Sequence, residues 1–213
     1  MRIRHLVPPV AMLCLIVTGC TTMSRGEPTP APTTETSAAA PPSTSTGDDG
    51  DVPSHGAPKV DEPFEETARY EQDPCSMLTT GQARELNLPT TGEPDEIPYG
   101  VGCKWRNTDT RGQVMISLLT DNDRGLSAVY AADQRGDLAY FVPLADIDGH
   151  PAVASDVEDR RSTGICIVDV GLTDQLLMGI ALNLSQANVG QKDPCEVAAD
   201  VAGMALQTMK DGA

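Results

Sequence analysis

Residues 164–170, GICIVDV, and residues 175–184, QLLMGIALNL, form the stretch that decides the fold of this chain. In the second run, large apolar residues from Leu176 to Leu184 alternate with smaller or polar ones. Period-two alternation of this kind is typical of a strand with one buried face. The two runs, joined by a short connection, therefore predict a β-hairpin.

A helix is expected to follow this hairpin at the end of the chain. Asp193 is a favourable N-cap, Pro194 is a favourable first helical residue, and Glu196 takes the third position. One apolar stripe runs along the expected helix, at Val197, Val201, Met204, Ala205 and Met209. A stripe with helical period predicts that the helix packs against the sheet.

Three more strands are expected before the hairpin, at residues 101–107, 113–120 and 140–147. Pro143 favours a sheet edge or a bulge for the last of them. Helices are expected at residues 126–135 and, in a short form, after Thr79, where Gln82 completes a capping box. The sequence thus predicts an α+β fold, with an antiparallel sheet of about five strands and helices packed on one face.

The N-terminus has the pattern of a secretion signal. Arg2 and Arg4 precede an uncharged run at residues 6–17, which is shorter than the about 20 apolar residues that cross a bilayer but fits a signal peptide. The run ends in Val17-Thr18-Gly19-Cys20, which resembles the lipobox of bacterial lipoproteins. This resemblance implies removal of residues 1–19 as a lipoprotein signal peptide and a diacylglycerol on the Cys20 thiol, anchoring the chain to the extracytoplasmic face of the cell membrane. The alternatives are an ordinary signal peptide with an incidental cysteine and an uncleaved anchor.

Residues 20–68 differ in composition from the chain that follows. They are rich in Pro, Thr and Ser, and Phe64 is their one aromatic residue. Such a segment buries too little apolar surface to offset its ordering entropy. We therefore expect a lipidated N-terminus and a disordered linker at 20–68, followed by a globular α+β domain at 69–213.

The chain is acidic, with 31 Asp and Glu against 15 Lys and Arg and a formal net charge of −16. Nucleic acids attract clustered positive charge, so no nucleic-acid partner is expected. Direct adhesion to anionic lipid headgroups is disfavoured for the same reason. The lipid anchor then remains as the means of membrane attachment.

Four cysteines lie in the expected domain: Cys75, Cys103, Cys166 and Cys195. An even number in an exported domain predicts two disulfides, for which three pairings exist. The tripeptide Asp-Pro-Cys occurs at residues 73–75 and 193–195, and each time it places a cysteine in the first turn of a helix. Because the other two lie in predicted strands, the pairings Cys75–Cys103 and Cys166–Cys195 are favoured. A zinc site would need paired C-x-x-C spacing, which the sequence lacks.

Five short motifs occur in order: DPCSMLT from residue 73, CKW from 103, GHPAV from 149, CIV from 166 and DPCEVA from 193. Together they resemble an actinobacterial lipoprotein family classed as a domain of unknown function. The resemblance covers residues 73–209 and implies a surface lipoprotein with two disulfides and no established activity. A looser likeness to the extracellular sensor domains of some mycobacterial kinases implies sensing of a ligand or of the cell wall.

Candidate catalytic groups are few. His150 lies near Asp146 and Asp148, but the sequence lacks the G-x-S-x-G elbow that presents a nucleophilic serine. Trp105 is expected in the core beside a disulfide. The alternative is that Trp105 and His150 line a pocket for a sugar or another small ligand.

Carboxylate pairs of the kind that glycosidases use are conceivable at Asp146 with Asp148, and among Asp156, Glu158 and Asp159. Residues 121–125, DNDRG, are similar to the start of a calcium loop but lack its later bidentate glutamate. Glycine-rich phosphate-binding loops are absent. The sequence therefore predicts no catalytic residue, no cofactor and no metal.

These observations predict a non-enzymatic, membrane-anchored extracytoplasmic lipoprotein that binds a cell-wall component, a small ligand or a partner protein. Two alternatives stay open. One is a hydrolase that acts on the cell wall through acidic loop residues. The other is a structural or secretion-accessory lipoprotein.

Overall fold

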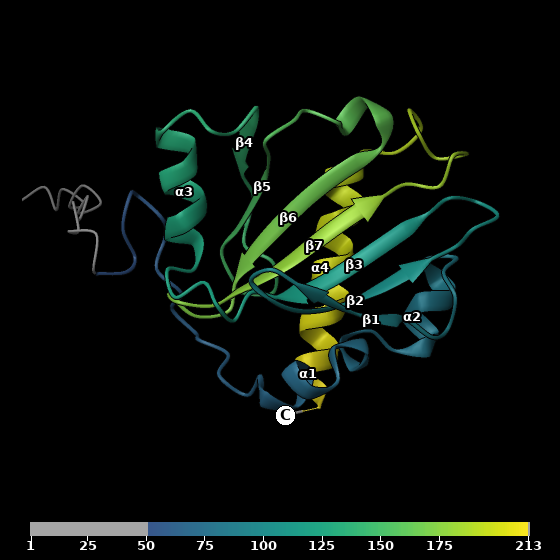
Figure 1. Cartoon of the computed structure of the whole chain (residues 1–213), viewed down its shortest axis with the longest axis horizontal. Helices are drawn as coiled ribbons and strands as arrows, with labels where there is room; N and C mark the ends of the chain where they lie inside the picture. Colours follow the sequence, from purple (N-terminus) through teal and green to yellow (C-terminus); the bar gives the residue numbers. More distant parts are fainter. Residues whose placement is uncertain (1–50, 213) are drawn as a thin grey trace, which may run out of the picture. The chain divides into compact units, whose positions relative to one another are not determined.

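The structure is a computed structural model that describes residues 51–212. These residues form an antiparallel sheet of seven strands in the order β1-β2-β3-β7-β6-β5-β4 (Figure 1). The strands are β1 (Glu93–Ile97), β2 (Gly100–Arg106), β3 (Gln113–Leu118), β4 (Tyr140–Pro143), β5 (Ala152–Asp156), β6 (Ile165–Gly171) and β7 (Leu177–Asn183). The predicted hairpin is confirmed as β6 and β7, which pair from Ile165 opposite Asn183 to Gly171 opposite Leu177.

The expectation of about five strands is wrong, because β1 and β5 join the sheet as well. Strand β1 has the sequence EPDEI and lies at a sheet edge, where a strand needs neither a continuous apolar face nor two hydrogen-bonded neighbours. Strand β5, with the sequence AVASD, is buried throughout but too short to give a clear alternation. Both end strands contain proline, Pro94 in β1 and Pro143 in β4, so the edge position favoured by Pro143 is confirmed.

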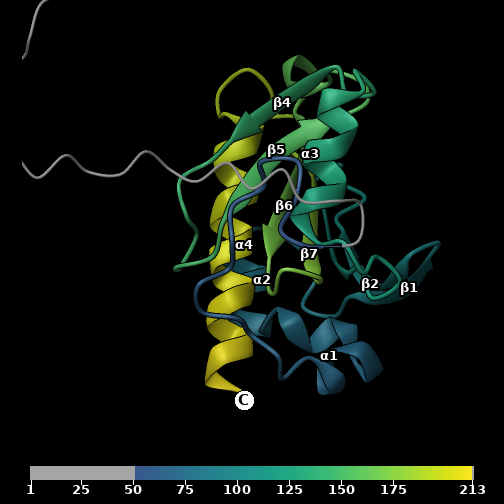
Figure 2. The same cartoon turned by 90° about the vertical axis from the view of Figure 1, so that its left-hand side faces the viewer.

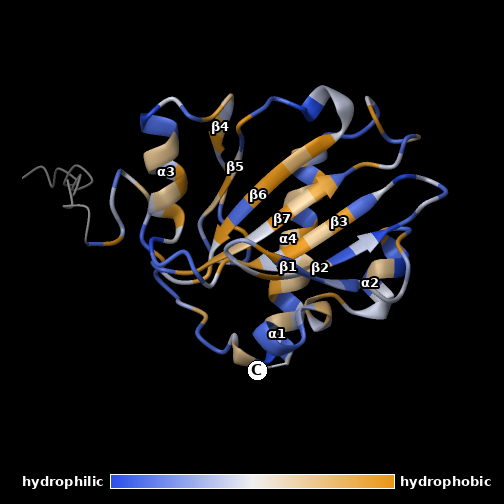
Figure 3. Cartoon of the chain, in the orientation of Figure 1, coloured by the Kyte–Doolittle hydropathy of each residue, from blue (hydrophilic) through white to orange (hydrophobic). Residues whose placement is uncertain are grey.

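Helix α4 (Pro194–Asp211) covers one face of the sheet behind β6, β7 and β3 (Figures 1 and 2). The Asp193 carboxylate caps it by accepting hydrogen bonds from the backbone N–H groups of Cys195 at 2.7 Å and Glu196 at 3.3 Å. On its packed side, α4 buries Ala198, Val201, Ala202, Ala205, Leu206 and Met209. The main core thus lies between α4 and the sheet, and colouring by hydropathy shows the apolar centre of β6, β7 and β3 (Figure 3).

Helix α3 (Leu126–Gln134) packs on the opposite face, so the expectation that all helices share one face is wrong (Figure 2). Leu126 forms a second apolar cluster with Val153 of β5 and Leu177 of β7. Tyr130 meets Phe141 of β4 edge to face, with ring centroids 4.8 Å apart. The run Leu176-Leu177-Met178 explains the difference, because consecutive apolar residues in a strand face both sides of the sheet.

Three short helical segments lie near the C-terminal half of α4: α1 (Ala68–Gln72), the 3-10 turn η1 (Pro74–Met77) and α2 (Thr80–Glu85). The capping box of Thr79 and Gln82 is present as predicted. The Gln82 side chain also donates to the Met204 carbonyl of α4 at 2.9 Å, and the Tyr70 hydroxyl donates to that of Met209 at 3.0 Å. None of the helices in residues 51–212 has both the length and the hydropathy to cross a membrane.

Residues 51–67, which the sequence assigns to the end of the linker, pack against the domain, and we call them the strap. Val60 and Phe64 are 4% and 7% exposed. The Phe64 backbone N–H donates to the Leu172 carbonyl at 2.8 Å, and that of Val60 donates to the Asp174 carboxylate at 2.9 Å. Within the described residues, packing against the domain thus begins ahead of the boundary expected at residue 69, through these contacts. The rest of the predicted linker lies outside the described residues.

Candidate functional site

Two disulfides join helical segments to strands. Cys75 of η1 is bonded to Cys103 of β2, and Cys166 of β6 is bonded to Cys195 in the first turn of α4, with Cα atoms 5.0 and 5.2 Å apart. These are the two pairings that the sequence favours. Cys20, the predicted lipid attachment site, lies outside the described residues.

A groove of about 550 Å³ runs between α4 and the segment that joins β4 to β5. Its apolar lining comes from Val142, Leu144, Ala145, Ile147, Ala154, Ala199 and Gly203. Ala199 and Gly203 lie one helical turn apart, and their small size leaves room beside the helix. A methyl group on Gly203 would lie 3.6 Å from Ile147, within van der Waals contact, so the space between the two walls is narrow at this end.

The rim of the groove is mainly acidic. Four carboxylates line it, those of Asp146, Asp193, Glu196 and Asp200, and Arg161 is the cation in this lining. Arg161 is already engaged, because it donates to Asp159 from Nε at 2.8 Å and from Nη2 at 2.7 Å. The groove therefore combines apolar walls with a negative rim, which disfavours anionic ligands.

Arg161 is held above the Tyr140 ring, with its guanidinium carbon 4.3 Å from the ring centroid. The hydrogen bonds from Arg161 lower the pKa of Asp159 to about 2. Asp159 thus stays ionised at neutral pH and paired with the guanidinium. A carboxylate in this state is a poor proton donor for hydrolysis.

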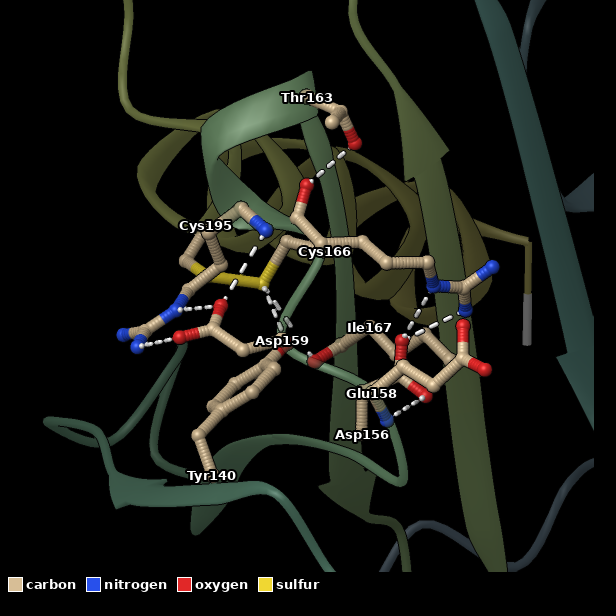
Figure 4. Close-up of polar contacts among 10 residues, drawn as sticks. Tyr140, Asp156, Glu158, Asp159, Thr163, Cys166, Ile167 and Cys195 are labelled. Atoms are coloured by element: carbon tan, nitrogen blue, oxygen red, sulfur yellow. Dashed lines mark hydrogen bonds and ion pairs between the residues drawn. A yellow bond between two sulfur atoms is a disulfide. The ribbon is translucent and has the colours of Figure 1, made fainter. Parts of the chain in front are cut away.

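A second carboxylate–guanidinium pair lies next to it. Asp156 is 6% exposed and accepts hydrogen bonds from Arg160 Nη2 at 2.6 Å and Nε at 3.0 Å (Figure 4). The Tyr140 hydroxyl lies 3.5 Å from Cys166 Sγ, which places both pairs beside the second disulfide. Of the predicted carboxylate group Asp156, Glu158 and Asp159, the first and the last are therefore each paired with a different arginine, and Arg161 of the second pair lines the groove.

The alternative pocket at Trp105 and His150 is not formed. Trp105 is 1% exposed and packs beside the first disulfide, so tightly that a methyl group on Gly92 would lie 2.6 Å from the indole. His150 is also 1% exposed, and its Nδ1 lies 2.9 Å from the Gly171 carbonyl oxygen. Both side chains belong to the interior of the fold.

The other acidic candidates lie in turns. Asp148 forms an ion pair with Lys210 at 2.8 Å, whereas Asp146 lines the groove. Within residues 121–125, the Asn122 side chain accepts a hydrogen bond from the backbone N–H two residues later, as in an ordinary turn. Within residues 51–212, no three His, Cys, Asp or Glu side chains gather where they could hold a metal ion.

The sequence does not reveal the groove, because the residues of α4 that line it lie beside the apolar stripe of the helix and not on it. Ala199 and Gly203, four residues apart, are the one sequence signal of that side. The other wall consists of residues 142–147. The sequence predicts a strand over residues 140–147, which is too long, because β4 ends at Pro143 and the chain then leaves the sheet.

No curated protein and no solved structure matches the chain. A family model does match it over residues 15–208, which include all four cysteines of the two disulfides. The chain therefore belongs to the family described as protein of unknown function (DUF3558).

Proposed function

We propose that this chain is a non-enzymatic lipoprotein, anchored to the extracytoplasmic face of the cell membrane, and that its domain binds a small ligand in the groove beside α4. The ligand has an apolar body and a cationic group. The observation that carries this proposal is the groove itself, with its apolar walls and acidic rim.

The size and lining of the groove support a small ligand. Its volume of about 550 Å³ falls in the range of about 300–1,000 Å³ that is common for small-molecule sites. Leu144 and Ile147 are partly exposed at its wall, and Val142 is 40% exposed at its edge. Covering these side chains with an apolar ligand body removes them from water, which favours binding.

The charge of the rim supports a cationic group on that ligand. Four carboxylates surround the apolar floor, and the single arginine of the lining is paired with Asp159. The chain as a whole carries a net charge of −16, which raises the local concentration of cations and repels anions. A non-enzymatic role agrees with the pairing of Asp156 and Asp159 with arginines, since neither is free to act as an acid or base.

The binding proposal is tested with two amphiphiles of equal chain length and opposite charge, dodecyltrimethylammonium and dodecyl sulfate, each below its micelle concentration. Calorimetric titration of the full chain should give about tenfold tighter binding of the cation, which corresponds to about 1.4 kcal/mol. Gly203→Leu fills the groove and should abolish binding of both. The control Gln207→Leu changes an exposed residue of the same helix outside the groove and should bind as the unaltered chain does.

Equal affinity for the two amphiphiles, or unchanged binding by Gly203→Leu, would refute the groove as the site. The anchor is tested separately by phase separation in a cloud-point detergent. The full chain from a bacterial host should enter the detergent phase, and Cys20→Ser should stay in the aqueous phase. If both partition alike, Cys20 is not the attachment point.

A further inference from the structure

Asp169 occupies an unusual place in the centre of the sheet. It lies in β6, opposite Gly179 of β7 on one side and Val153 of β5 on the other. Its neighbours Val168 and Val170 are fully buried on the α4 side, so Asp169 faces the other side of the sheet, where it is only partly buried. An apolar residue would be expected at such a position.

The Asp169 carboxylate has no hydrogen-bond or ion-pair partner within residues 51–212. Burial raises its pKa to about 7, since the desolvated charge is not offset by a neighbouring donor or cation. Even partial burial of an unpaired carboxylate destabilises a fold. A cationic group brought to this carboxylate by a ligand would compensate its charge.

A second oxygen lies close to this carboxylate. A methyl group on Gly179 would lie 3.3 Å from Asp169 Oδ1, 3.0 Å from Ser117 Oγ and 3.2 Å from Leu119 Cδ1. Both oxygens therefore converge above Gly179, beside an apolar side chain. The Ser117 hydroxyl donates its proton to the Gly179 carbonyl at 3.3 Å, which leaves its lone pairs as acceptors. Carboxylate and hydroxyl together therefore offer only acceptors, an arrangement that fits a cationic donor.

The sheet face around these oxygens is apolar and incompletely covered. Helix α3 buries Val153 and Leu177 on this face, near β4 and β5. Farther along it, Ile165, Ile167, Ala181 and Met115 are only partly buried. These residues belong to the adjacent strands β6, β7 and β3, in front of which Figure 1 shows no helix. Three strands at about 4.8 Å spacing make a surface broader than one small ligand covers.

We propose that this face docks a partner protein that inserts an arginine or lysine side chain between Asp169 and Ser117, while apolar residues of the partner cover Ile167 and Ala181. Charge complementarity favours this occupant, because an unpaired carboxylate and a chain of net charge −16 attract a basic partner. A second copy of this chain would bring a net charge of −16 against an equal charge, which disfavours self-association through the same face.

The test uses two probe peptides, acetyl-Val-Arg-Val-amide and the same peptide with neutral citrulline in place of arginine. Two-dimensional NMR of the nitrogen-labelled full chain should show shifts of the Ile167, Ser117 and Gly179 amides. The arginine peptide should bind about tenfold more tightly than the citrulline peptide. Asp169→Asn should remove that preference, and the control Asp200→Asn, on the rim of the groove, should retain it.

Three outcomes would overturn the proposal: equal binding of the two peptides, a preference for arginine that survives in Asp169→Asn, or amide shifts confined to the groove of α4. Self-association is checked by light scattering. A dimer of the full chain that Ile167→Arg dissociates would identify a second copy as the occupant and would refute the basic partner. A spectrum of Asp169→Asn that matches the unaltered chain away from β6 verifies that the variant is folded.

Discussion

Cys166 and Cys195 join the middle of the sheet to the first turn of α4, directly beside the groove. Cys195 itself contributes to the groove lining, and Cys166 lies 3.5 Å from the Tyr140 hydroxyl beneath the stacked Arg161. The first disulfide, at Cys75 and Cys103, lies away from the groove lining and ties η1 to β2. The chain therefore offers a matched pair of crosslinks, of which one touches the candidate site.

Replacing both Cys166 and Cys195 by alanine should lower the free energy of unfolding by about 3–4 kcal/mol, as expected for loops of this length. Replacing Cys75 and Cys103 should cost a similar amount, because the sequence separations are 29 and 28 residues. Only the replacement of Cys166 and Cys195 should weaken dodecyltrimethylammonium binding. Urea denaturation and calorimetric titration measure the two effects, and equal loss of binding in both variants would contradict a local role.

Phe64→Ala should destabilise the domain by about 2–4 kcal/mol, because the ring is buried in the main core. Phe64 belongs to the strap, so this loss would show that the strap is part of the folded domain. The exposed neighbour Glu65→Ala should change stability by less than about 0.5 kcal/mol. Both values come from urea denaturation of the full chain. Equal stability of the two variants would mean that the strap is not part of the folded domain.

Asp156→Ala should lower the free energy of unfolding more than Asp159→Ala does. The Asp156 carboxylate is buried and binds Arg160 through two hydrogen bonds, so its loss should cost about 1–3 kcal/mol. The pair of Asp159 with Arg161 is exposed and screened by solvent, and its loss should have little effect on stability. Thermal unfolding at neutral pH measures both variants, and the melting temperature of Asp156→Ala should be the lower one. A lower melting temperature for Asp159→Ala would contradict this prediction.

Asp169→Asn should stabilise the fold at neutral and alkaline pH. Because the folded chain binds this proton more tightly than the unfolded chain, the wild type loses stability as pH rises from about 3.8 to about 7, and the variant does not. Its neighbours Val153, Gly179 and Ser117 do not titrate in this window, and burial raises the pKa of Tyr130 on α3, which stays neutral.

The expected gain is at most about 4 kcal/mol above neutral pH, because one pKa unit corresponds to about 1.4 kcal/mol, and it is close to zero below about pH 3.8. This gain is measured by urea denaturation of the wild type and of Asp169→Asn at pH values from below 3.8 to above neutral. A constant difference at every pH would show that the carboxyl does not titrate as its burial implies. Asp174→Ala serves as a control: it removes the carboxylate that accepts a hydrogen bond from the Val60 backbone N–H, so this variant should lose stability instead.

Much of the fold follows from local patterns. The alternation in β7, the caps of α2 and α4, and the repeated Asp-Pro-Cys tripeptide each place an element or a crosslink correctly. Each depends on residues that are close in sequence and act through one physical rule. Membership in a family of unknown function is also confirmed, while the actinobacterial origin, the likeness to kinase sensor domains and the lipid anchor stay predictions.

The features that were missed depend on distant contacts. Phe64 packs into the core beside residues far along the chain, and its backbone N–H donates to the Leu172 carbonyl. The groove exists because the small residues Ala199 and Gly203 lie across from Ile147, and neither wall has a pattern of its own. The position of Asp169 opposite a glycine likewise requires the register of β6 with β7.

The prolines in the two outermost strands affect how neighbouring copies of the domain can pair with the sheet. Pro94 and Pro143 each remove an amide donor from an outermost strand. A neighbouring molecule that tried to extend the sheet would meet an interrupted row of donors on either side. Growth of the sheet into fibres by edge-to-edge pairing is therefore disfavoured when many copies of the domain lie close together.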